Sequence, residues 1–157
     1  MAYLPETQTA VVPITAAQIK QLNTAPVIII PARAGCVIKI HSSLFVYTYG
    51  TTPFGPIDSN DTIALVEGSP LTGNGFTTGF VLNVTGFLDQ TQNMGMWNAL
   101  TMANPISGNL PSIDLVDTPV ALFQYNQNSG WPSGTNWLVG DGTMVVMVRY
   151  AYIEVTP

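Results

Sequence analysis

The sequence predicts an all-β fold, a β-sandwich or jelly roll that begins with a short helical segment. Apolar and polar residues alternate with a period of two in several short segments, as in strands with one buried face. Turn-forming Gly, Pro, Asn and Ser clusters separate these segments, with 14 Gly and 12 Pro in 157 residues. Only one place carries a clear helix-start signal. Short alternating strands between such turns are typical of sandwiches and jelly rolls.

The helical segment begins at Thr15. Thr15 is the predicted N-cap and Gln18 follows three residues later, which is the spacing of a capping box. Ile19 and Leu22 fall on one helical face. Pro26 ends the helix, because the residue before a proline is excluded from the helical region. We expect a helix of about two turns, which is too short to be stable alone.

Strands are expected over 27–30, from 36 onward after the turn 31–35, and over 62–67, 80–84, 120–125 and 143–155. In the second strand, alternation assigns one face to Ile38, Ile40, Leu44 and Val46, and the opposite face to Lys39, Phe45, Tyr47 and Tyr49. Segment 143–155 is apolar on both faces, which indicates a central strand or one covered by another subunit. Residues 90–117 are less regular, and 97–103 are predicted to form one or two helical turns.

The chain is predicted to be one domain over residues 14–157, preceded by an N-terminal arm over residues 1–13. Pro5, Pro13 and the polar stretch between them lack strong periodicity. Such an arm is mobile when free and can reach a neighbouring subunit. No linker, repeat or charge run divides the remaining residues.

Charged residues are scarce. They make up 8% of the chain, against about 25% in an average soluble domain. A surface poor in charge suits burial against other subunits, and a secreted polar-neutral β-domain is the alternative. Nucleic-acid binding is not expected, because the four basic residues are scattered. A signal peptide is not expected, because residues 1–10 have neither a basic start nor an apolar run. A membrane span is not expected, because no apolar run approaches about 20 residues.

No enzymatic chemistry or cofactor is predicted. His41 is the only histidine and Cys36 the only cysteine. A zinc site needs three or four His, Cys or acidic ligands, and a Ser-His-Asp site would need His41 beside a nucleophile and a carboxylate, so neither site is expected. Cys36 alternates with Ile38 and is expected to be a buried thiol. The loop from Asp58 to Asp61 is oxygen-rich and could hold calcium, although an Asx-rich turn explains it equally well.

Aromatic residues supply the candidate interface. These residues are Trp131 and Trp137 in a polar loop, Trp97, and Tyr150 and Tyr152 in the last strand. Anchor residues at interfaces are often aromatic. As alternatives, Trp131 and Trp137 could stack on sugar rings or pack under their own loop.

Three segments in order resemble a family of small virion proteins of tailed bacteriophages. They are ITAAQIKQLNTAPVIIIPARAGCVIKI from Ile14, YTYGTTPF from Tyr47 and GDGTMVVMVRY from Gly140. Together they cover roughly a third of the chain, and residues 57–137 do not visibly match. Many family members carry a similar helix, strand and Pro-Ala-x-Ala-Gly turn near the start.

The resemblance implies an all-β structural protein of the phage head, a capsid decoration (cement) protein at the virion surface. It also implies the major capsid protein and further copies of the chain as partners, with a trimer favoured. Since members also serve elsewhere in the virion, a glycan-binding fibre, neck or tail component is the alternative.

Overall fold

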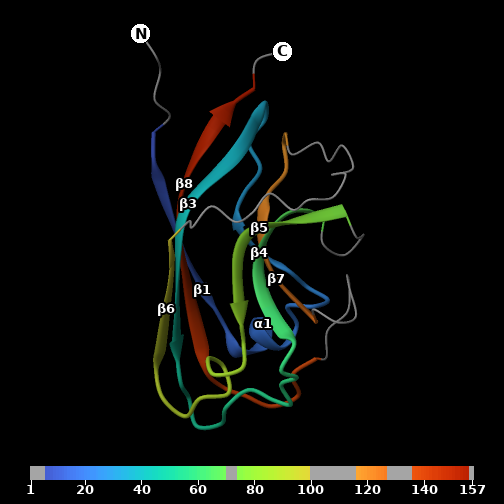
Figure 1. The fold of residues 1–157 in the computed structure, drawn as a ribbon, viewed down its shortest axis with the longest axis vertical. Helices are drawn as coiled ribbons and strands as arrows, with labels where there is room; N and C mark the ends of the chain where they lie inside the picture. Colours follow the sequence, from blue (N-terminus) through green and yellow to red (C-terminus); the bar gives the residue numbers. More distant parts are fainter. Residues whose placement is uncertain (1–5, 70–73, 100–115, 127–135, 156–157) are drawn as a thin grey trace.

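The computed structural model describes residues 6–69, 74–99, 116–126 and 136–155, which form two antiparallel four-stranded sheets. The first sheet has the spatial order β1 (Gln8–Ile14), β8 (Thr143–Glu154), β3 (Cys36–Thr48), β6 (Met94–Ala99). The second has the order β2 (Val27–Ile30), β7 (Val120–Asn126), β4 (Asp61–Ser69), β5 (Asn74–Asn83). Figure 1 shows the sheets as two layers, with the short helix α1 (Ala16–Lys20) near one end. The predicted all-β class is confirmed.

The core lies between the two sheets, and both contribute alternate residues to it. The first sheet supplies Ile14, Ile38, Ile40, Phe45, Tyr47, Met144, Val146 and Val148. The second supplies Ile30, Ile63, Leu65, Phe80, Leu82, Val120 and Leu122. A separate small cluster, made of Ala64, Val66 and Phe123, lies on the other face of the second sheet. Burial of these apolar side chains is the main force that holds the layers together.

The predicted capping box is present. The Thr15 backbone N–H donates to Gln18 Oε1 at 2.9 Å, and the Gln18 N–H donates to Thr15 Oγ1 at 3.3 Å. Ile19 and Leu22 are both fully buried, as their spacing predicts. The helix spans only five residues, and its burial rather than its length makes it stable.

The structure differs from the predicted arm over residues 1–13. Gln8–Ile14 forms β1, which pairs with β8 from Gln8↔Tyr150 to Ile14↔Met144. A side-chain hydrogen bond also joins the two strands, since the Tyr150 hydroxyl donates to Gln8 Oε1 at 2.9 Å. Pro13 is compatible with this pairing because β1 is an edge strand. Residues 1–5 lie outside the described part.

A β-bulge at His41 changes which residues of β3 face the core. Ile40 pairs with Tyr150 and Ser42 with Arg149, so His41 is the additional residue in this ladder. The buried positions consequently change from even numbers, up to Ile40, to odd numbers from Ser43 through Tyr47. The predicted common face of Ile38, Ile40, Leu44 and Val46 is therefore wrong. Leu44 and Val46 point away from the core.

The predicted helical turn at Trp97 is also wrong. Met94–Ala99 is strand β6, and Trp97 pairs with Leu44 of β3. Met94 and Met96 pack against the core, while Trp97 on the opposite face is 61% exposed. The cause is tertiary, because β3 offers a long free edge that this segment pairs with. Residues 100–103 lie outside the described part.

Two turns that are distant in sequence meet at one end of the sandwich. The Asp141 carboxylate accepts hydrogen bonds from the Thr51 and Thr52 backbone N–H groups, both at 2.8 Å, and from the Thr51 hydroxyl at 2.5 Å. These hydrogen bonds, of which that from the Thr51 hydroxyl has the largest effect, lower the pKa of Asp141. Gly140-Asp141-Gly142 thereby fixes the turn that follows β3.

Glu67 makes stability depend on pH. It is 6% exposed on the inner face of β4, and its Oε1 has no hydrogen-bond partner in the described structure. Burial raises the pKa of Glu67 from 4.5 to about 7, although the Ile38 backbone N–H partly opposes the change. Between pH 4.5 and about 7, the Glu67 carboxyl group is therefore protonated to a greater extent in the folded state than in the unfolded state.

We therefore expect the free energy of unfolding to fall as pH rises from about 4.5 to 7 and to level off above. Glu67→Gln should remove this contribution, which is on the order of 3 kcal/mol for a pKa raised from 4.5 to about 7. Urea unfolding of both proteins at several pH values measures the difference. If the two curves stay parallel across this range, Glu67 is not the group responsible.

Candidate interaction surface

The face of the first sheet that points away from the core, here called the outer face, carries a row of apolar side chains that are partly or largely exposed. The strand registers place Val11 opposite Met147, Met147 opposite Leu44, and Leu44 opposite Trp97. The row crosses all four strands, β1, β8, β3 and β6. At its two ends Val11 is 56% exposed and Trp97 is 61% exposed.

A second row lies beside the apolar row. Its members are Pro13, Val145, Val46 and Gly95. Val145 and Val46 are half-buried. Contiguous exposed apolar area of this kind marks an interaction site more often than isolated exposed side chains do.

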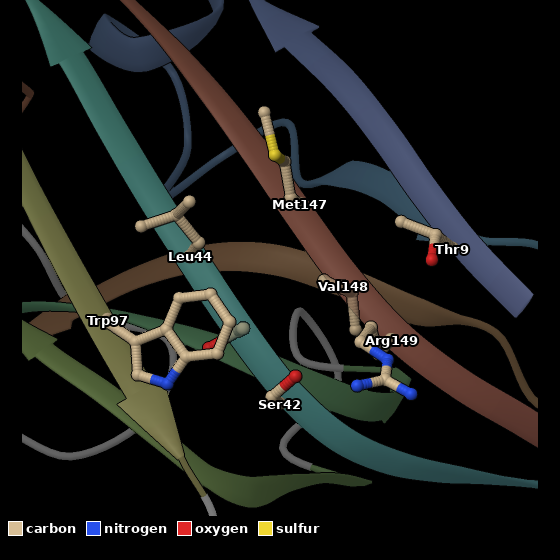
Figure 2. Close-up of a pocket in the computed structure, with 8 residues that line it drawn as sticks. Thr9, Ser42, Leu44, Trp97, Met147, Val148 and Arg149 are labelled. Carbon is tan, nitrogen blue, oxygen red and sulfur yellow. The ribbon is translucent and has the colours of Figure 1, made fainter. Parts of the chain in front are cut away.

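A shallow groove of about 170 Å³ opens on the outer face, beside the apolar row. It is lined by Thr9, Ser42, Ser43, Leu44, Trp97, Met147, Val148 and Arg149. Figure 2 shows the Trp97 indole on one side of Ser42 and the Arg149 guanidinium on the other, with Leu44 and Met147 further along. Ser42 can lie there because the bulge at His41 turns it outward.

The charge of the outer face is cationic. Lys39 and Arg149 occupy outward positions on β3 and β8, and both are exposed. The described strand positions of this face include no acidic residue. The one ion pair within the described ranges joins Arg33 and Glu154 at 3.9 Å, so Lys39 and Arg149 take no part in it. The outer face therefore combines an apolar centre with two positive charges in a chain of formal net charge −5.

The structure places the predicted interface aromatics in different environments. Trp137 is 1% exposed, donates through Nε1 to Asp61 Oδ2 at 3.3 Å, and packs 6.2 Å from the Phe54 ring. It is a core residue and cannot contact a partner in this conformation. Trp131 lies outside the described residues.

Tyr150 and Tyr152 are largely engaged within the chain. Tyr150 is 8% exposed and belongs to the core. The Tyr152 hydroxyl donates to the Pro31 carbonyl at 2.8 Å, and the Arg33 guanidinium lies 5.4 Å from its ring centroid. Only Trp97, among the predicted aromatics that the structure describes, stands exposed on the outer face.

Sequence reasoning did not single out Val11, Leu44 and Met147 as interface residues. The two-sided apolar pattern of segment 143–155 does contain the signal for Met147. Leu44 faces outward only because of the bulge at His41, and Val11 belongs to this face only because β1 pairs with β8. The sequence pattern reveals neither feature.

The oxygen-rich loop before β4 is a hydrogen-bonded turn. The Asn60 N–H donates to Asp58 Oδ1 at 2.8 Å, and the Asp61 N–H donates to the Asp58 carbonyl at 2.9 Å. The Asp61 carboxylate accepts from the Asp58 N–H at 3.1 Å and from Asn126 Nδ2 at 3.2 Å, in addition to Trp137. Within the described ranges no three His, Cys, Asp or Glu side chains gather as metal ligands.

No protein-family model, curated protein or solved structure matches this chain. Among the described residues, no helix combines the length and apolar character that crossing a membrane requires.

Proposed function

We propose that the protein is a structural component of a tailed-bacteriophage virion, a capsid decoration protein that binds and stabilises the assembled head. It acts without catalysis. Binding to neighbouring major capsid protein subunits adds free energy that only the assembled shell gains, so the shell resists disassembly. The protein self-associates in this role, with a trimer favoured by the family resemblance.

The outer face carries this proposal. The apolar row of the outer face has exposed ends, Val11 and Trp97, and a half-buried middle, Met147 and Leu44. Such a row is poorly suited to a free monomer, whereas its burial in an assembly is favourable. The low charge content of the whole chain supports the same conclusion.

We also propose that the sandwich is a jelly roll. An eight-stranded jelly roll has two four-stranded antiparallel sheets built from Greek keys. The orders β1-β8-β3-β6 and β2-β7-β4-β5 agree with this arrangement, because each sheet alternates strands from the two halves of the chain.

The family resemblance gains support from contacts between its motifs. Asp141 of the GDG motif binds Thr51 and Thr52 of the YTYGTT motif, and a Cβ on Gly142 would lie 2.5 Å from the Tyr47 ring. Two of the three segments on which the resemblance depends thus form one structural unit.

Glycan binding in a fibre, neck or tail component is the second candidate. Trp137 does not support it, because the ring is buried. The exposed Trp97 indole, in a groove that hydroxyl-bearing Ser42 and Thr9 also line, is the observation that favours it. The groove is nevertheless mainly walled by Leu44, Met147 and the indole, and such walls suit apolar protein side chains better than sugars.

Trp97→Ala is expected to weaken attachment to heads of the encoding phage at least about tenfold, measured by co-sedimentation. The free protein should stay folded, because the ring is mostly exposed. Ile28→Ala, a half-exposed site on the second sheet, is the matched control and should bind normally. Wild-type protein that neither co-sediments nor has density in the virion would refute the proposal, and a glycan-array ligand lost in Trp97→Ala would favour the alternative.

A further inference from the structure

The apolar groove beside Trp97 has the size of one side chain. Its volume is about 170 Å³, whereas cavities of about 150 Å³ in protein cores accept a benzene molecule. The groove is open to solvent on the outer face, between Trp97 and Arg149 (Figure 2). One leucine-sized side chain, accompanied by a negative charge for Arg149, is the occupant that this geometry fits.

Leu138 is an exposed side chain of this size on a fixed backbone. It is 76% exposed, the largest value among the exposed large hydrophobic side chains of the described residues. Its N–H donates to the Gly55 carbonyl at 2.9 Å, and the Val139 N–H donates to the same carbonyl at 3.1 Å. Buried Trp137 precedes it directly. Because the backbone is already ordered, insertion of Leu138 into a groove costs little conformational entropy.

Negative charges accompany Leu138. Asp141 lies three residues after it, and Asp58 lies three residues after Gly55, to which Leu138 is hydrogen-bonded. Both carboxylates are exposed, and hydrogen bonds hold the pKa of each below its usual value, so both are ionised at neutral pH. The loop that holds Leu138 lies at the lower end of the sandwich in Figure 1, on the side of the second sheet.

We propose that Leu138 of one copy inserts into the Trp97 groove of the next copy in a head-to-tail contact. The cationic outer face then meets the acidic loop, with Arg149 near the carboxylates that accompany Leu138. Face-to-face pairing of two outer faces would instead bring Arg149 and Lys39 of both copies together without an acidic partner, which is unfavourable. A head-to-tail contact repeats and closes into a ring when its rotation permits. The inference rests on the self-association included in the proposed function, not on attachment to a capsid.

Cysteine cross-linking of the free protein tests the contact. In a Cys36→Ala background, which removes the only native thiol, Ser42→Cys marks the groove and Val139→Cys marks the exposed residue next to the inserted Leu138. A short bismaleimide should join the two variants when they are mixed, and should join neither variant alone. The double variant should give a ladder of covalent oligomers.

Leu138→Ser provides a measurement without cross-linking. The dissociation constant of the oligomer should rise at least about tenfold, by light scattering or mass photometry. Val155→Ser, another exposed apolar site, should leave it unchanged. Dimers from Ser42→Cys alone would indicate face-to-face pairing and overturn the inference.

A wild-type protein that remains monomeric at about 100 μM would also overturn it. The inference would also be overturned if the protein forms oligomers but the two cysteine variants do not cross-link when they are mixed. If these results occur while the wild-type protein still binds phage heads, the head-to-tail contact is refuted and the decoration function stands.

Discussion

Gly140→Ala is expected to destabilise the protein by about 3–5 kcal/mol, a large part of the stability of a single domain. Gly140 has φ +120°, a conformation that side-chain-bearing residues rarely adopt. A Cβ at this position would collide with the Phe54 ring. That ring is 3% exposed and lies between Tyr47 and Trp137, at centroid distances of 6.1 and 6.2 Å, so it has no room to move.

Substitutions at two other glycines distinguish the cost of a positive φ from the cost of a clash with the Phe54 ring. Gly35 has φ +69° but open space around a Cβ, so Gly35→Ala should cost only about 1 kcal/mol. Gly95, in strand β6, has open space and no positive φ, so Gly95→Ala should be neutral or stabilising by about 0.5 kcal/mol. Urea unfolding of the three variants measures the series. Equal losses in Gly140→Ala and Gly35→Ala would show that the Phe54 ring relaxes and that packing there is loose.

Asp61→Ala is expected to cost about 3–4 kcal/mol. The carboxylate is fully buried and accepts hydrogen bonds from Trp137 Nε1 at 3.3 Å, from Asn126 Nδ2 at 3.2 Å and from the Asp58 N–H at 3.1 Å. Its removal deprives the buried Trp137 indole of its acceptor, and an unsatisfied buried donor costs about 1–3 kcal/mol. The change also leaves space in the interior. Denaturant unfolding gives the value.

Two further variants identify the cause of this loss. Asp58→Ala, in the same loop but exposed, should be far milder. Trp137→Phe keeps most of the ring but removes the donor, so the double variant with Asp61→Ala should show a coupling of about 1–2 kcal/mol. Strictly additive losses would mean that the hydrogen bond between Asp61 and Trp137 contributes nothing.

Features with local causes could be predicted from the sequence. The capping box of Thr15 and Gln18 involves neighbours three residues apart, and Ile19 and Leu22 are buried as their spacing predicts. Most strands followed from period-two alternation and turn residues, so the all-β class needed no knowledge of contacts. The alternation pattern also predicts the apolar second face of β8, which carries Met147. It does not predict which partner covers that face.

Which residues share the outer face depends on contacts between strands that are distant in the sequence. The extra residue at His41 reversed the orientation of Leu44 and Val46, and alternation alone cannot locate a bulge because the bulge depends on the partner strand. β1 and β6 formed because β8 and β3 offered free edges, whose hydrogen-bonding groups favour pairing over the weak local preferences of Gln8–Ile14 and Met94–Ala99. Trp137 became core because Asp61, 76 residues away, accepts its N–H. Each of these outcomes depends on contacts between segments that are distant in the sequence. Such contacts contribute more free energy than local conformational preferences do.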